Sequence, residues 1–84
     1  MDLEALKHAS KIVTGTKQTT KAVVGNLARH VFIARDAEER IVSPVIAACE
    51  EKQIPVTYVE TMEELGKACK IKVGAAMAAI LAEE

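Results

Sequence analysis

The apolar positions of this 84-residue chain form short segments that alternate between strand-like and helix-like spacing. Apolar segments at residues 11–14, 30–34 and 56–59 predict strands, because β-branched or continuous apolar side chains fill the covered faces of a sheet. Between these segments apolar residues recur every three or four positions, as on the buried face of a helix. Helices are therefore predicted near the N-terminus, over residues 16–26, from a charged loop at 35–40 to about residue 51, and over residues 61–69.

Local signals mark the ends of several elements. Gly15 closes the first strand, and Gly25, next to an asparagine, is a favourable helix stop. Thr61 and Glu64 have the spacing of a capping box, in which the threonine hydroxyl caps the following helix. The alanine-rich residues 75–81 favour helix by propensity, yet an unbroken small apolar segment also suits a buried strand, and we predict a strand.

The alternation of strands and helices predicts one α/β domain over residues 1–84, with a mainly parallel sheet between helices. The length allows a single modest core. In such sheets ligands bind beyond the strand ends, where loops lead into helices. The turns at residues 14–18, 35–40 and 70–74 are therefore expected to lie side by side.

The segment Gly15–Lys21 is the candidate binding segment. It opens a predicted helix whose spacing buries Ala22, Val23 and Leu27 and leaves Lys17 with Lys21 on another face. A helix N-terminus has unpaired N–H groups and partial positive charge, which suit an anionic partner. A polar helix start after a glycine is also an ordinary way to leave a strand, so both interpretations stay open here.

Composition limits the kind of partner. Half of the residues are apolar, which predicts a folded chain, and Phe32 and Tyr58 are its two aromatic residues. This argues against a sheet that stacks bases on several aromatic rings. The net charge of −1 argues against a general basic coat, although residues 1–40 carry seven Lys/Arg against five Asp/Glu and residues 41–84 carry four against seven.

Reactive residues do not assemble into a catalytic or metal motif. Cys49 and Cys69 are isolated in apolar helical patterns, which predicts buried thiols in a reducing cytosol and no disulfide. His8 and His30 stand apart from any nucleophile or acid at motif spacing, and Gly15 lacks the spacing of a phosphate-binding loop. We predict no enzyme activity, metal or cofactor. The N-terminus lacks the pattern of a secretion signal and no apolar stretch reaches membrane-spanning length, so a cytoplasmic protein without membrane contact is expected.

Four segments in order resemble the L-seven-Ae ribosomal protein superfamily, the kink-turn RNA binders, and especially its short bacterial members. They are Gly15–Lys21, the strand end at residues 34–38, Cys49–Pro55 and Leu65–Cys69, and the resemblance spans about residues 10–82. It implies a three-layer α/β/α sandwich with a mixed four-stranded sheet. It also implies binding of the kink-turn, a sharply bent RNA helix–bulge–helix with sheared G·A pairs, in ribosomal or regulatory RNA.

The resemblance also assigns roles to residues of this chain. The family pattern Gly-x-Asn-Glu-x-Thr-Lys begins at Gly15, with Lys17 and Gln18 in place of Asn and Glu, the residues that read the guanine edges. Glutamine both accepts and donates, whereas lysine only donates; the short bacterial members resemble this chain in the same exchange. Glu38 matches an acid that contacts a flipped-out bulge base. The implied RNA-binding residues are Gly15, Thr16, Lys17, Gln18, Thr20, Lys21, Arg35, Glu38, Ile71, Lys72 and Val73.

Two classes of function remain open from the sequence. In the first, the chain binds a kinked RNA, with Lys21, Arg35 and Lys72 on phosphates and Ile71 and Val73 under the bulge bases. In the second, it is a protein-interaction or scaffold domain on the same fold. In that case the two lysines are a solvated helix face and the apolar loop residues are core anchors. A monomer is expected, and the ribosome is a candidate partner.

Overall fold

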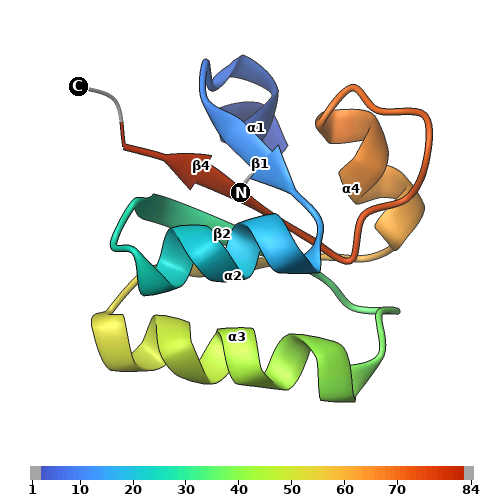
Figure 1. Cartoon of the computed structure of the whole chain (residues 1–84). Helices are drawn as coiled ribbons and strands as arrows, with labels where there is room; N and C mark the ends of the chain where they lie inside the picture. The colour runs from blue at the N-terminus through green and yellow to red at the C-terminus, as the bar shows by residue number, and fades with distance from the viewer. Residues whose placement is uncertain (1–2, 83–84) are drawn as a thin grey trace.

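The structure, a computed structural model, describes residues 3–82 as four helices and four strands (Figure 1). In chain order these are α1 (Leu3–His8), β1 (Ile12–Thr14), α2 (Thr16–Val24), β2 (Ala28–Ala34), α3 (Glu39–Lys52), β3 (Val56–Val59), α4 (Met62–Ala68) and β4 (Met77–Leu81). Every predicted strand and helix is present, including the final strand, whose sequence also allowed a helix. Among the described residues, no helix has the length and apolar character needed to cross a membrane.

The four strands form one mixed sheet in the order β1-β4-β2-β3. Strand β4 lies between β1 and β2 and runs antiparallel to both, so that Ala79 faces Val13 on one side and Val31 on the other. Only β2 and β3 are parallel, with Ile33 opposite Tyr58. The mainly parallel sheet predicted from the alternation is therefore wrong, because the chain after α4 turns back and inserts β4 against its neighbours. The mixed four-stranded sheet implied by the resemblance is confirmed.

Helices cover both faces of the sheet. Helices α2 and α3 lie on one face and α1 and α4 on the other (Figure 1). Strand β2 supplies both cores, because Val31 and Ile33 pack toward α2 and α3 while Phe32 and Ala34 pack toward α1 and α4. Burial on two faces explains why residues 31–34 of β2 form a continuous apolar run. The three-layer sandwich is thus built on an interior strand whose residues 31–34 are buried on both faces, whereas Arg29 near its start is exposed.

Two details of α2 and α4 show where the local signals succeed. Helix α2 ends at Val24, and Asn26 adopts a left-handed backbone with a φ of 61°. This turn carries Leu27 out of the helical face, so the side chain is 52% exposed and the prediction that it is buried is wrong. The Thr61 hydroxyl accepts a hydrogen bond from the Glu64 N–H at 3.0 Å, which confirms the predicted cap of α4.

The two cysteines are buried and free, as predicted. Cys49 packs in the core between α3 and the sheet, and Cys69 packs on the opposite face. Burial raises the pKa of both thiols above its ordinary value, because the apolar surroundings disfavour the thiolate. Both side chains therefore serve the core as small apolar groups.

Candidate nucleic-acid interface

The three turns singled out from the sequence lie at one end of the sheet, on the right in Figure 1. The Gly15 N–H donates to the Met77 carbonyl at 2.9 Å, which ties the start of α2 to the start of β4. The Ala34 N–H donates to the Ala76 carbonyl at 2.9 Å, which ties the end of β2 to the same segment. Because β4 runs against both β1 and β2, its beginning meets their ends. The expected grouping of these turns is therefore present.

The N-terminus of α2 is open. Gly15 has a φ of 90° and a ψ of 161°, a conformation that is essentially limited to glycine. A β carbon there would meet no atom within 4 Å, so backbone conformation and not crowding requires the glycine. Within residues 3–82 no side chain caps this helix, and its first turn carries no acidic residue. Its first N–H groups are consequently free to bind an anion.

The side chains of α2 divide as the sequence predicts. Thr16, Lys17, Gln18 and Lys21 are exposed, and Thr20 is half-buried. The opposite face buries Thr19, Ala22 and Val23 in the core. The hydroxyl of Thr19 is fully buried and has no hydrogen-bond partner within the described part of the chain. The open helix start therefore carries two lysines and a glutamine on a single exposed face.

The loop after β2 presents Arg35 and Glu38 with their local partners. The Arg35 guanidinium lies over the Tyr58 ring, 5.1 Å from its centroid, and 3.7 Å separate its Nε from Glu60 Oε2. A cation over an aromatic face is attracted by the ring electrons. The Glu38 carboxylate accepts from Arg40 Nε at 3.2 Å. Both predicted residues are exposed at the surface, and each has a counter-charge that an incoming ligand must compete with.

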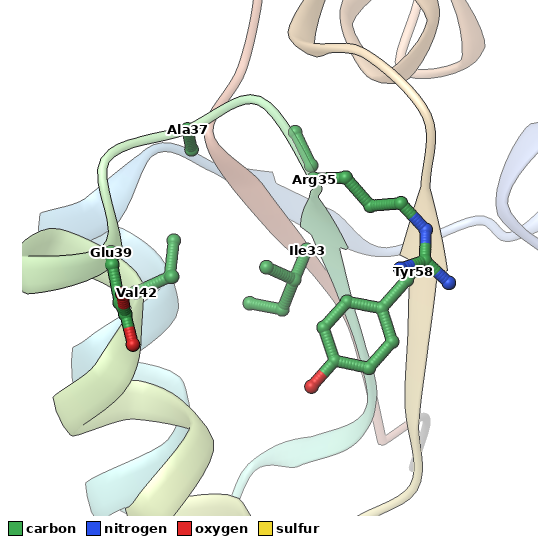
Figure 2. A pocket seen from close by; sticks show the side chains of 7 residues that line it. Ile33, Arg35, Ala37, Glu39, Val42 and Tyr58 are labelled. Carbon is green, nitrogen blue, oxygen red and sulfur yellow. The ribbon is translucent and has the colours of Figure 1, made fainter.

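A pocket of about 240 Å³ opens beside this loop, between α3 and the edge strand β3 (Figure 2). Figure 2 shows Ile33 between Val42 on α3 and the Tyr58 ring on β3, with Arg35 at the rim. The pocket is lined by Ile33, Ala34, Arg35, Ala37, Glu39, Val42 and Tyr58. It combines an apolar floor with an aromatic wall and two charged groups, which suits a planar ring with polar edges.

No sequence pattern predicts this pocket. Tyr58 is 45% exposed and reaches the site because β3 pairs with β2 in a register that sets Ile33 opposite Tyr58. The signal that the sequence does contain is an aromatic residue in a strand otherwise made of valine and threonine. Its place in the site depends on the strand pairing, which no local pattern specifies.

The loop between α4 and β4 holds the other predicted residues. Ile71 is half-buried and packs against the core beneath α4, and its N–H donates to the Gly66 carbonyl at 3.1 Å. Lys72 is exposed, and Val73 is 71% exposed. Ile71 thus anchors the loop while part of it stays at the surface, and Lys72 and Val73 are exposed to a partner.

His30 contacts residues of β2 and β3. His30 Nε2 lies 2.7 Å from Thr57 Oγ1, and its ring stacks on Phe32 with centroids 4.6 Å apart. This is the environment of a structural side chain. Among the residues that the structure describes, no group of three or more His, Cys, Asp or Glu side chains could hold a metal ion.

Comparison with known proteins adds relatives of nearly the same length. An RNA-binding protein of Geobacillus thermodenitrificans is 49% identical over 81 residues, which cover 96% of this chain and 99% of the relative. An RNA-binding protein of Caldanaerobacter subterraneus is 54% identical over 69 residues, or 82% of this chain and 84% of the relative. The names of these relatives agree with a binding protein and not with an enzyme.

A solved structure and a family model agree with these relatives. The 15.5kD RNA binding protein of Giardia lamblia superposes with a TM-score of 0.87 and 32% identity, over 98% of this chain and 72% of that one. The family model described as ribosomal protein L7Ae/L30e/S12e/Gadd45 matches residues 2–84. The resemblance found in the sequence is thereby confirmed, and the chain belongs to the ribosomal protein L7Ae/L30e/S12e/Gadd45 family.

Proposed function

We propose that this protein binds RNA and that its ligand is the kink-turn, a bent helix–bulge–helix with sheared G·A pairs. The observation that carries the proposal is the uncapped start of α2, which projects Lys17, Gln18 and Lys21 beside two loops that hold further cationic and apolar groups. Membership of the family and the names of the relatives support RNA as the partner. The kink-turn itself follows from the family resemblance.

In this proposal the start of α2 enters the groove at the G·A pairs. Gln18 takes the guanine edge, where its amide both accepts and donates, and Lys17 donates to guanine N7 or O6. Gly15 and Thr16 bring the backbone N–H groups close to the RNA, and Thr20 supports the helix start from its half-buried position. These side chains and N–H groups recognise the RNA by hydrogen bonds, and no base stacks on the sheet.

The two neighbouring loops hold the bulge. Glu38 contacts an unpaired base, and the pocket between Val42 and Tyr58 is large enough to receive its ring. Ile71 and Val73 form the apolar support under the other bulge nucleotides. The cationic side chains on the RNA backbone are Lys21, Arg35 and Lys72.

Binding on three sides favours the bent RNA over the extended one, since only the bent form brings the G·A pairs and the bulge to the three turns together. The experiment that tests this uses a kink-turn RNA with a donor and an acceptor dye at its two ends. Addition of the protein in the absence of divalent cations should raise energy transfer as the ends approach. A straight duplex of equal length is the control, and unchanged transfer in the kink-turn would contradict the proposal.

The proposed setting is a monomer in the cytoplasm, with ribosomal RNA or a regulatory leader as the source of the kink-turn. Salt separates this proposal from a scaffold role. Phosphate neutralisation makes RNA affinity fall steeply with salt, whereas an apolar protein contact changes little.

A further inference from the structure

Asp36 links the loop after β2 to the start of α4. Its Oδ1 accepts a hydrogen bond from the backbone N–H of Met62 at 2.8 Å, across 26 residues of chain. Met62 is the first residue of α4, and the neighbouring Thr61 hydroxyl caps the Glu64 N–H. The start of α4 is therefore held by one side chain of its own and by one from the loop after β2.

The same residue, Met62, also holds the loop before β4. Its carbonyl accepts from the Ala75 N–H at 3.1 Å. Gly74 lies so close that a β carbon there would be 3.1 Å from the Met62 β carbon. Met62 is thus bonded to both loops: its N–H donates to Asp36 in the loop after β2, and its carbonyl accepts from Ala75 in the loop before β4.

We propose that Asp36 is a positioning residue for RNA binding, which holds Arg35 and Glu38 at a defined distance from Lys72 and Val73 through the backbone of Met62. This inference rests on the proposed function. Asp36 follows Arg35 directly, so release of its carboxylate frees the loop that carries the cation and the base-contacting acid. A carboxylate that accepts from a backbone N–H makes a strong, short hydrogen bond, which suits this task.

If Asp36 acted only through its charge, its removal would have the opposite effect on RNA binding. An exposed carboxylate beside a phosphate-binding surface repels RNA, so removal of a free charge should strengthen binding. Removal of a positioning contact should weaken binding although one negative charge is lost. The sign of the effect therefore separates the two roles.

The experiment compares kink-turn RNA binding by the wild-type protein and by Asp36→Ala, Asp36→Asn and Asp36→Glu at a temperature where circular dichroism shows all four folded. Asp36→Ala should weaken binding roughly tenfold, the scale of a lost hydrogen bond to a charged group. Asp36→Asn keeps the accepting oxygen and should restore most of the affinity. Asp36→Glu keeps the charge but displaces the oxygen by one methylene, so it should also weaken binding, and it replaces Asp36→Ala if that variant does not fold.

A matched control removes a nearby carboxylate without this contact. Glu63 follows Met62, its side chain is 79% exposed, and its partner is Lys67 on the same helix. Glu63→Ala should leave binding unchanged or slightly tighter. Amide hydrogen exchange in the free protein should show faster exchange at Met62 and Ala75 in Asp36→Ala than in Asp36→Asn.

The possible results separate the positioning role of Asp36 from the proposed binding of kink-turn RNA. If the wild-type protein binds kink-turn RNA and Asp36→Ala binds it equally or more tightly, the positioning role is overturned and the proposed function stands. Equal losses in Asp36→Ala and Asp36→Asn also overturn it, because the accepting oxygen then does not matter. Failure of the wild-type protein to bind the intact kink-turn overturns both.

Discussion

The backbone of Gly66 in α4 packs directly against the backbone of Val73, so closely that a β carbon at residue 66 would overlap the Val73 carbonyl oxygen. Gly66 is buried, and its carbonyl accepts from the Ile71 N–H at 3.1 Å. Contact with the backbone of α4 therefore fixes the position of the loop that carries Lys72 and Val73. A glycine inside a helix is unfavourable by propensity, and this close approach is its physical reason.

Gly66→Ala should accordingly destabilise the protein although alanine favours helix. The added methyl group meets backbone, which cannot rotate away, so we expect a loss of about 2 kcal/mol or more in the free energy of unfolding. Urea denaturation measures it. Lys67→Ala, at the exposed neighbouring position, is the control and should change stability by about half a kcal/mol or less. A Gly66→Ala protein as stable as wild type would show that the loop moves freely from α4.

Gln18→Ala tests the proposed guanine contact. Gln18 is exposed in the first turn of α2, so its removal should leave the unfolding midpoint unchanged. Affinity for a kink-turn RNA should fall by about 1–3 kcal/mol, the range for loss of a specific base contact. Fluorescence anisotropy with labelled RNA measures the change. Normal affinity in this variant would mean that Gln18 does not read the RNA.

Lys21→Ala tests the proposed phosphate contact through salt dependence. Each neutralised phosphate contributes about one unit to the slope of log affinity against log salt. The variant should bind kink-turn RNA more weakly and lower the magnitude of this slope by about one. Lys52→Ala is the matched control, because Lys52 lies at the far end of α3 and its Nζ donates to Asn26 Oδ1 at 3.0 Å. Equal slopes for Lys21→Ala and wild type would remove Lys21 from the interface.

Stability should depend on pH through His30. Desolvation lowers the pKa of its ring below the ordinary 6.5, so the unfolded chain takes up this proton at a higher pH than the folded one. The stabilisation of the neutral ring is fully present above pH 6.5 and is lost as the pH falls from there through the lowered pKa of the folded state. Urea denaturation across this range should show the loss. His30→Gln should flatten the profile, and an unchanged profile in that variant would assign the effect to other groups.

Local patterns were sufficient to place the strands and helices of this protein. The continuous apolar run of β2, the cap at Thr61 and the glycine before α2 each depend on neighbours in sequence, and each has the predicted structure. Leu27 shows the limit. Helical spacing predicts its burial, but the left-handed turn at Asn26 ends the helix first.

Local sequence patterns did not predict the direction of the last strand or the contacts between residues distant in sequence. The alternation of strands and helices favours parallel pairing. No local pattern in β4 predicts that this strand lies between β1 and β2 and runs antiparallel to both. The hydrogen bond from the Met62 N–H to Asp36 and the placement of Tyr58 beside Ile33 depend on how α4 packs beside the loop after β2 and on the register of β3 against β2. The sequence therefore predicts which turns form the site, while the contacts that align them emerge only from the packed fold.

Recognition of the kink-turn can be tested by a gel-shift titration. The protein is titrated against a standard kink-turn RNA and against the same RNA with its sheared G·A pairs replaced by Watson–Crick pairs. We predict tight binding to the intact motif and a large loss of affinity for the replaced one, because in the proposed complex the start of α2 reads the guanine edges of those pairs. Equal, weak binding to both RNAs would contradict it and would reduce the interface to a general site for anions.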